Sequence, residues 1–200
     1  MSDQERWETR FSSPGYLFGK EPSAFLKAQV HRLRAGQTTL AVADGEGRNG
    51  VWLAQQGLDV LAIDYSPTAL AKARALAAER GVSLRTEVAD VTKWAWPKSA
   101  FDVIAAIFIA VAVADRPTFF ANLKAALKPG GLLLMQSYRP EQINYKTGGP
   151  PDAALMCTRE ILQAAFGDLL ELDIREHDSV LNEGSAHVGM SALIDLVGKK

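Results

Sequence analysis

Apolar residues along this chain fall into two kinds of segment that alternate. In one kind the residues are β-branched or apolar without interruption, as in Thr38–Ala43; in the other they recur at helical spacing, as in Phe119, Phe120 and Leu123. Such alternation is typical of a parallel sheet covered by helices on both faces. The predicted strands of this part of the chain are 38–43, 58–63, 82–89, 101–108 and 132–137.

Helix signals lie between these strands. Ser66 is an N-cap residue with Pro67 at the first helical position, and Thr158 is placed to cap a short helix near the end of the chain. Residues 128–131, Lys-Pro-Gly-Gly, are expected to end a helix before the next strand begins. The predicted helices are 48–56, 66–81, 116–127 and 158–166.

The C-terminal part of the chain contains two extended segments with no helix between them. Residues 169–178 and 187–197 are joined through Asn182–Ser185, so we expect an antiparallel hairpin. The predicted fold class is α/β: a doubly wound, seven-stranded, mostly parallel sheet with helices on both faces and a C-terminal antiparallel hairpin. Such a sheet is Rossmann-like, but it differs from the all-parallel dinucleotide-binding fold. We expect the 200 residues to form one domain.

Acidic residues follow three of the predicted strands at the point where each ends. The first strand leads into Asp44, Gly45 and Gly47, and glycines allow a backbone to turn sharply and to approach a ligand. Asp64 lies 19 residues after Gly45, where a carboxylate can bind both hydroxyl groups of a ribose. Asp90 ends the third strand and can accept a hydrogen bond from an adenine amino group. Three carboxylates at one sheet edge suit a cofactor with a sulfonium cation and suit a pyrophosphate badly.

Each of these residues also has a purely structural interpretation. The glycines fit an ordinary tight turn between a strand and a helix. Asp64 fits a turn residue before Ser66, and Asp90 fits a cap for the turn before Trp94.

The order of the motifs is more specific than any one of them. The chain resembles the class I S-adenosylmethionine-dependent methyltransferases in the succession AVADGEGRN, LAIDYSP, VAD, FDVI and LKPGG. Three further motifs resemble those of a small bacterial branch of this class that is similar to the tellurite-resistance methyltransferases. These motifs are WETRFSSPGYLFGKEPSAFL, TGGPPD and NEGSAHVG. The resemblance covers the chain from about Trp7 to Gly189 and implies S-adenosylmethionine as cofactor.

The resemblance also implies roles for individual residues. Residues 44–47 would lie under the methionine part of the cofactor, Asp64 would bind the ribose, and Asp90 would lie by the adenine. Tyr65 and Val91 would flank the adenine ring. The residues implied to bind the cofactor are Asp44, Gly45, Glu46, Gly47, Arg48, Asn49, Asp64, Tyr65, Ser66, Asp90, Val91, Ile107, Phe108 and Tyr16, with Ile107 and Phe108 at the methyl-donor end.

Three positions depart from the pattern of the family. Its glycine-rich turn usually has an acid near position 41 and its first glycine at position 43, where this chain has Ala41 and Ala43. Asp44 is the acid that can supply the missing charge. Relatives of the bacterial branch often carry a histidine just after the fourth strand, where this chain has Ala110.

Two segments are expected to close the site. The resemblance implies that the N-terminal segment, residues 1–35, acts as a lid through aromatic residues such as Trp7 and Phe18, although it could equally pack on the core. The insertion 139–157 follows the fifth strand at the edge where substrate groups are bound, so we expect it to close the acceptor pocket. No catalytic residue stands out, because methyl transfer depends mainly on positioning; His187 and Tyr145 are weak candidates.

Composition restricts the partners. The net charge of −1 gives no general attraction for nucleic acid or an anionic membrane. The longest apolar run, Val103–Ala114, is too short to cross a membrane. Cys157 is the only cysteine, so an internal disulfide and a cysteine zinc site are excluded. We expect no metal, a cytoplasmic monomer or homodimer, and a small-molecule or inorganic nucleophile as acceptor. A thiol or a chalcogen oxyanion is considered, because Arg139 and Lys146 could attract an oxyanion.

Two other functions stay open. Gly45, Gly47 and Gly50 satisfy the Gly-x-Gly-x-x-Gly spacing of an NAD-type oxidoreductase, although Asp44 and Glu46 would stand beside its pyrophosphate. The missing histidine at position 110 also allows a protein that binds S-adenosylmethionine without turnover.

Overall fold

The computed structural model describes residues 2–200 and contains one seven-stranded sheet with the strand order β3-β2-β1-β4-β5-β7-β6. Strands β1 to β5 are parallel, and β7 runs antiparallel to both β5 and β6. The predicted fold class is therefore confirmed. The strands are β1 (Thr38–Val42), β2 (Asp59–Asp64), β3 (Arg85–Val88), β4 (Phe101–Ile107), β5 (Leu127–Tyr138), β6 (Glu171–Glu183) and β7 (His187–Lys199).

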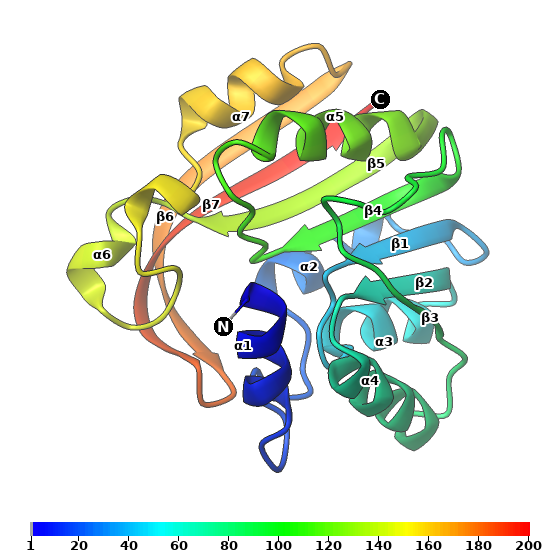
Figure 1. Ribbon diagram of the computed structural model, residues 1–200. Coiled ribbons are helices and arrows are strands. Elements are labelled where there is room, and N and C mark those ends of the chain that lie inside the picture. Colours follow the sequence, from blue (N-terminus) through cyan, green and yellow to red (C-terminus); the bar gives the residue numbers. More distant parts are fainter. Residues whose placement is uncertain (1) are drawn as a thin grey trace.

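Helices cover both faces of the sheet (Figure 1). One face packs on α5 and α7 through Phe119, Leu123 and Phe166. The other packs on α2 and α3 through Leu26 and Leu53, and α4 packs beside α3. The helices are α1 (Asp3–Phe11), α2 (Ala24–Ala28), α3 (Arg48–Gln55), α4 (Pro67–Glu79), α5 (Arg116–Ala126), α6 (Gln142–Tyr145) and α7 (Arg159–Phe166), with 3-10 turns at Val30–Arg32 and Ala153–Leu155.

The predicted helix starts are confirmed by their caps. The Ser66 hydroxyl accepts a hydrogen bond from the Ala69 N–H at 3.0 Å, and Pro67 is the first residue of α4. The Thr158 hydroxyl accepts from the Ile161 N–H at 3.3 Å. These local signals act within four residues of one another, which is why the sequence alone locates them.

Two expectations about the strands were wrong. Helix α5 does end just before segment 128–131, at Ala126, but the fifth strand begins at Leu127 and not at the predicted residue 132, so 128–131 belongs to β5. The extra residues are absorbed by a register shift against β4 between Phe101 and Val103, and Gly130 supplies the left-handed φ of +75° that this irregularity needs. The third strand is also shorter than the predicted 82–89, because only Arg85–Val88 pairs with β2.

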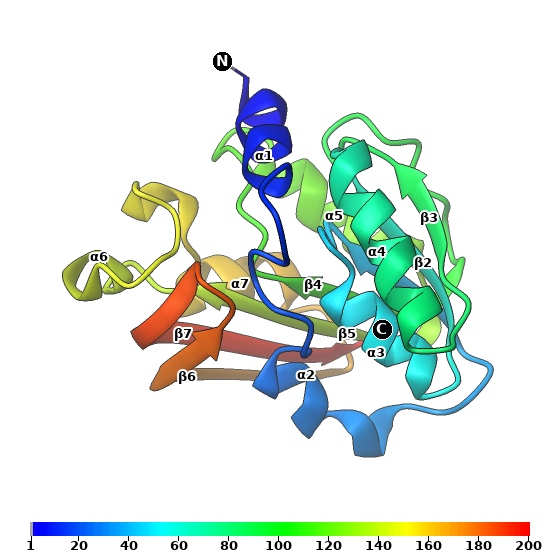
Figure 2. The same ribbon diagram turned by 90° about the horizontal axis from the view of Figure 1, so that it is seen from below.

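The β6–β7 hairpin near the C-terminus holds the N-terminal segment over the sheet edge. The β6–β7 hairpin turns at Gly184, where the Ser185 N–H donates to the Leu17 carbonyl at 3.0 Å, so the turn holds the N-terminal segment. Helix α1 lies across the ends of the strands and stands out from the sheet when the molecule is seen from below (Figure 2). Within residues 2–200 no helix is both long enough and apolar enough to cross a membrane.

Candidate functional site

The loop after β1 has the geometry of a ligand cradle. Ala43, Gly45 and Gly47 all have left-handed φ angles, of 47°, 57° and 88°. The Asp44 carboxylate accepts from the Gly50 N–H at 3.0 Å, in the first turn of α3. A side chain at position 50 would place its Cβ 2.4 Å from the Asp44 Oδ2 atom, so glycine is needed there. Burial raises the pKa of Asp44 to about 7, and the nearby charge of Asp64 adds to this shift.

Asp64 lies next to this loop at the end of β2. Its carboxylate accepts from the N–H groups of Gly45 and Ser66, both at 2.9 Å, and the residue is 3% exposed. Burial raises the pKa of Asp64 to about 6 against the opposing effect of these two hydrogen bonds. The structure therefore brings together two carboxylates that are poor in positive partners, as the strand-end positions predicted.

Asp90 is placed less distinctively. Its carboxylate accepts from the N–H and hydroxyl of Thr92, at 2.9 and 2.7 Å, and pairs with Lys93 at 3.1 Å. This is the capping arrangement that the sequence left open. The side chain remains 37% exposed, and its contact with an adenine stays a prediction.

Three residues of the cradle contact other parts of the chain. Glu46 accepts from the Leu17 N–H at 2.6 Å and from Lys72 at 2.8 Å, and Asn49 accepts from the Ser23 N–H at 3.0 Å. Arg48 pairs with Glu183 of the hairpin at 2.8 Å. These side chains hold the N-terminal segment and the hairpin in place. Only the backbone N–H and C=O groups of these three residues are therefore left to contact a cofactor.

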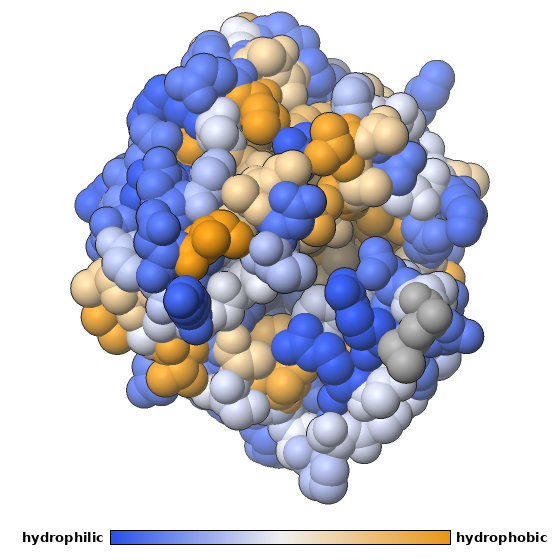
Figure 3. Space-filling view, turned by 60° about the vertical axis from the view of Figure 1, so that its left-hand side comes forward, coloured by the Kyte–Doolittle hydropathy of each residue, from blue (hydrophilic) through white to orange (hydrophobic). Residues whose placement is uncertain are grey.

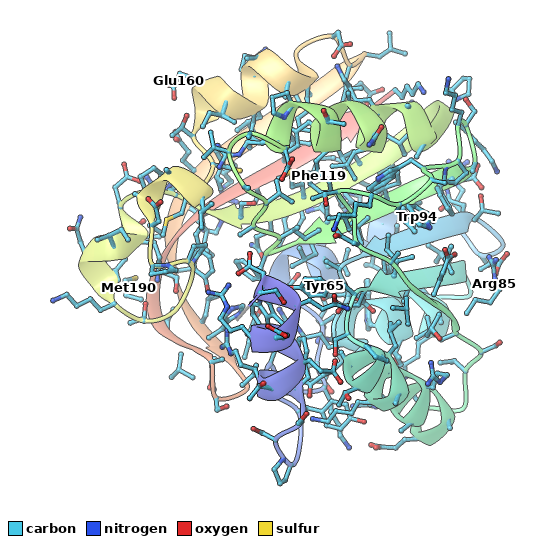
Figure 4. All side chains as sticks on the ribbon, viewed as in Figure 1. Tyr65, Arg85, Trp94, Phe119, Glu160 and Met190 are labelled. Atoms are coloured by element: carbon cyan, nitrogen blue, oxygen red, sulfur yellow. The ribbon has the colours of Figure 1, made fainter. Side chains whose placement is uncertain are left out.

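Helix α1 covers the cradle. Glu8 accepts hydrogen bonds from the hydroxyl groups of Ser66 and Thr68, and Gln4 donates to the Tyr65 carbonyl at 2.9 Å. The Phe11 ring lies against Gly45, where an added Cβ would be 3.2 Å from it. Figure 4 shows Tyr65 beside α1. A cofactor on the cradle would lie under this helix, as a lid requires, although the motion of a lid stays a prediction.

Two further residues, Tyr16 and Val91, were predicted to contact the cofactor, and their neighbours in the structure do not decide whether they do. The Tyr16 hydroxyl donates to the Lys72 carbonyl on α4 at 3.2 Å, and the ring packs beside Leu76. Val91 packs against the core on the α5 side of the sheet, together with Trp94. Both contacts remain predictions.

The other end of the site is aromatic. Phe108, at the end of β4, holds a left-handed φ of 57°, which is strained for a bulky residue. Its ring packs 4.8 Å from the ring of Tyr138, at the end of β5, and 4.8 Å from the ring of His187, at the start of β7. Phe18 closes the group 4.4 Å from His187. The face of the molecule that carries α6 and the hairpin is hollowed near its centre, and hydrophobic residues border the hollow (Figure 3).

His187 is buried in a charged cluster. Its Nδ1 atom lies 3.4 Å from Glu183, which is the carboxylate that pairs with Arg48. Burial lowers the pKa of His187, so its ring is neutral at pH 7, while Arg48 and His187 hold the pKa of Glu183 low against the opposing effect of burial. Sequence reasoning missed Glu183, which was interpreted as part of a turn, and Tyr138, which lies one residue beyond the predicted fifth strand.

Tyr145 and Arg139 lie away from this cluster. The Tyr145 hydroxyl donates to Asp178 at 2.8 Å, and Arg139 pairs with both Asp178 and Glu141. The structure thus separates Tyr145 from His187, the two weak catalytic candidates. Over residues 2–200 it contains no group of three or more His, Cys, Asp or Glu side chains that could hold a metal ion.

The chain is similar to known methyltransferases in sequence. Residues 39–131 match the family model of a methyltransferase domain. Over 107 residues the chain is 36% identical to phosphoethanolamine N-methyltransferase 1 of Triticum aestivum, a match that covers 53% of this chain and 22% of that enzyme. The chain therefore spans less than a quarter of the length of this relative.

Solved structures share the whole fold. A protein solved for the conversion of a disulfide bond into a thioacetal group during echinomycin biosynthesis superposes with a TM-score of 0.74, at 20% identity over 99% of this chain and 91% of that one. TehB of Haemophilus influenzae gives a TM-score of 0.71, at 14% identity over 98% of this chain and 66% of that one. N-methyltransferase NodS of Bradyrhizobium japonicum, in complex with S-adenosyl-L-homocysteine, also gives 0.71, at 14% identity over 98% and 97%.

Proposed function

We propose that this chain transfers a methyl group from S-adenosylmethionine to a small-molecule acceptor, because residues 39–131 match the family model of a methyltransferase domain on a chain with the class I fold. The resemblance seen in the sequence is confirmed at the level of this class, and TehB, a structural neighbour, represents its tellurite-resistance branch. The acceptor and the residue roles that follow are part of the proposal.

The observation that carries the proposal is the pair of desolvated carboxylates beside a glycine loop. Asp44 and Asp64 have raised pKa values because burial leaves their charge poorly compensated. A cofactor with an ammonium group, a sulfonium and a ribose diol supplies the cations and hydroxyl donors that such carboxylates bind. The residues fit S-adenosylmethionine: Asp64 would bind the ribose, and Asp44 would face the cationic methionine part in place of the acid missing at Ala41.

When bound, S-adenosylmethionine supplies an activated methyl group on a good leaving group. The chain then has to hold the acceptor in line and exclude water. Positioning of this kind can contribute about 7–11 kcal/mol to lowering a barrier. Helix α1 covers the cradle through Glu8 and Phe11, and the aromatic end supplied by Phe108 and Tyr138 excludes water from the acceptor side.

The geometry argues against the NAD alternative. The third glycine of the Gly-x-Gly-x-x-Gly spacing, Gly50, donates its N–H to Asp44, so this N–H is not free to bind a phosphate. A pyrophosphate would meet the carboxylates of Asp44 and Asp64, and like charges at this spacing repel. Binding without turnover remains the second candidate, because Ala110 stands where relatives of the bacterial branch often have a histidine.

Two of the cations near the acceptor end are compensated within the protein. Arg139 is paired with Asp178 and Glu141, and Arg48 is paired with Glu183, so neither guanidinium offers an uncompensated charge. The net charge of −1 supports a small acceptor over a nucleic acid.

Calorimetry followed by a turnover panel tests the proposal. We expect the protein to bind S-adenosylmethionine and S-adenosylhomocysteine and to leave NAD unbound. With labelled cofactor we expect methyl transfer to a small molecule in a panel of thiols, selenite, tellurite, total RNA and protein extract. Binding of NAD alone would refute the methyltransferase, and cofactor binding with no labelled product would favour binding without turnover.

A further inference from the structure

The acceptor end of the site contains a histidine whose two ring edges face different groups. The edge with Nδ1 faces Glu183 at 3.4 Å. A methyl group placed on Gly148 would lie 3.6 Å from His187 Cδ2, the atom bonded to Nε2, and 3.6 Å from the Tyr138 hydroxyl oxygen. His187 Cδ2 and the Tyr138 hydroxyl oxygen therefore both lie close to Gly148, which must be glycine because the same methyl group would be 2.8 Å from the Ala186 carbonyl oxygen.

The polar groups on this side have no protein partner. The Tyr138 hydroxyl is buried without a hydrogen bond from or to any described residue, and the residue is 4% exposed. His187 Nε2 likewise makes no hydrogen bond within residues 2–200, whereas Nδ1 lies by Glu183. A buried hydroxyl without a partner costs about 1–3 kcal/mol, so its retention beside a free imidazole nitrogen points to a ligand that satisfies both.

Glu183 orients the histidine as a base. Arg48 pairs with Glu183 at 2.8 Å and keeps it charged, so Glu183 accepts the Nδ1 proton of His187. Nε2 then carries the lone pair. This is the arrangement in which a carboxylate fixes the tautomer of a neutral imidazole that removes a proton from a nucleophile.

We propose that His187 is the catalytic base of the methyl transfer, that the Tyr138 hydroxyl binds the acceptor atom, and that the acceptor is an apolar thiol. This inference rests on the proposed function. As the sulfur of the acceptor attacks the methyl carbon, its S–H proton passes to Nε2 of His187. The new S–C bond forms with a sulfur lone pair, and the bond from the methyl group to the sulfonium breaks with its electrons on the departing sulfur. The imidazolium then returns the proton to water.

The surroundings favour a thiol over other acceptors. The rings of Phe18, Phe108 and Tyr138 pack around His187, and sulfur packs favourably on aromatic rings. A thiol has an ordinary pKa of about 8.5 and a phenol of about 10, so the thiol proton lies closer to the range of an imidazole. An oxyanion of selenium or tellurium attacks through a lone pair and needs no base, which would leave His187 without a function.

The test uses the whole protein with benzyl mercaptan, p-cresol and selenite as acceptors. The variants are His187→Gln, Glu183→Gln and Tyr138→Phe. His177→Gln is the matched control, because His177 lies on the same hairpin and also pairs with a carboxylate, Asp195, at 2.8 Å. Circular dichroism and calorimetry with S-adenosylmethionine verify that each variant folds and binds the cofactor.

We expect benzyl mercaptan to be methylated and His187→Gln to lower kcat by at least about 100-fold at pH 7. In that variant kcat should rise tenfold per pH unit toward the pKa of the thiol itself. In the wild type it should level off above the pKa of His187, which NMR titration of its ring protons measures independently. The groups that face His187 and set this pKa are Glu183 on β6, Arg48 on α3, Arg10 on α1 and Tyr138 on β5.

The other variants separate the roles. Glu183→Gln should lower kcat about 10-fold or more and shift the NMR titration of His187 to lower pH. Tyr138→Phe should weaken the binding of benzyl mercaptan to the complex with S-adenosylhomocysteine about 5-fold, a measurement that needs no turnover. His177→Gln should match the wild type in both assays.

A His187→Gln variant that equals the wild type at every pH would overturn the proposal. If that variant does not fold, an unchanged kcat in Glu183→Gln, with benzyl mercaptan as acceptor, does the same. Methylation of selenite or p-cresol without methylation of benzyl mercaptan overturns the thiol assignment, and so does cofactor binding with no methylated acceptor. Absence of S-adenosylmethionine binding is a separate result that refutes the proposed function.

Discussion

The two ends of the candidate site differ in whether their charged side chains have partners of opposite charge. At the ends of β1 and β2, two desolvated carboxylates have pKa values raised to about 7 and about 6. At the ends of β4 and β5 and the start of β7, the charged residues Arg48 and Glu183 neutralise each other, and aromatic rings surround a neutral histidine. This contrast supports our proposal that one end binds a cationic cofactor and the other end binds the acceptor. The sheet places them side by side because both lie at the same edge.

Removal of the carboxylate that we propose binds the ribose should have the largest effect on the cofactor end. We expect Asp64→Ala to weaken S-adenosylmethionine binding by about 2–4 kcal/mol, because two hydroxyl groups lose a charged acceptor. Calorimetry measures this loss. Asp173→Ala is the control, because Asp173 is exposed on β6, away from the cradle. Unchanged affinity in an Asp64→Ala protein with a native circular dichroism spectrum would show that Asp64 does not bind the cofactor.

The glycine loop of the same end tolerates no side chain at position 47. In Gly47→Ala the new Cβ would lie 2.6 Å from the Ala73 Cβ, at a φ of +88°. The strained backbone and the forced separation of α3 from α4 should lower the free energy of unfolding by about 2–3 kcal/mol. Urea denaturation checks this value. Gly36→Ala, at a similar φ of +82° but with open space around it, should lose only the backbone part, about 1 kcal/mol.

How far the sequence predicts this site depends on how far apart the contacting residues are. Asp44 and Asp64 were placed correctly at one edge because the ends of parallel strands always meet there. Three partners of Glu46, Arg48 and Asn49 were missed because they lie in the N-terminal segment and the hairpin, whose docking follows from no local pattern: Leu17, Ser23 and Glu183.

The strand signals failed for related reasons. Residues 128–131 have the composition of a turn, and they lie within β5 at the irregularity between its pairs Phe101–Leu127 and Val103–Leu132 with β4. Tyr138 and Glu183 each terminate a strand that is longer than its apolar pattern. Their role in one cluster with His187 appears only when β5, β6 and β7 are adjacent.

The contrast between the two ends also predicts how stability depends on pH. A carboxyl whose pKa is raised on folding binds more protons in the folded state, so its contribution to stability is present below the unfolded pKa near 3.8 and is lost as pH rises to about 7. Without cofactor, the wild type should therefore lose stability between pH 4 and pH 7. Asp44→Asn should remove about 1 kcal/mol or more of that loss, measured by thermal denaturation at both pH values. An equal pH dependence in the two proteins would show that Asp44 is not the group responsible.

The smallest expected effect tests the strain in the turn itself. Ala43 adopts a φ of 47°, in the left-handed region that costs a residue with a Cβ roughly 1–2 kcal/mol. Glycine has no such cost, but it raises the conformational entropy of the unfolded chain, which lowers stability by about 0.5–1 kcal/mol. Ala43→Gly should therefore raise the free energy of unfolding by about 0.5–1 kcal/mol, measured by urea denaturation without cofactor. Ala41→Gly is the control: Ala41 lies within β1 and is buried, so it should only lose stability. If Ala43→Gly destabilises the protein as Ala41→Gly does, the turn is unstrained. The alanine would then fit the cradle as well as the glycine usual at this position.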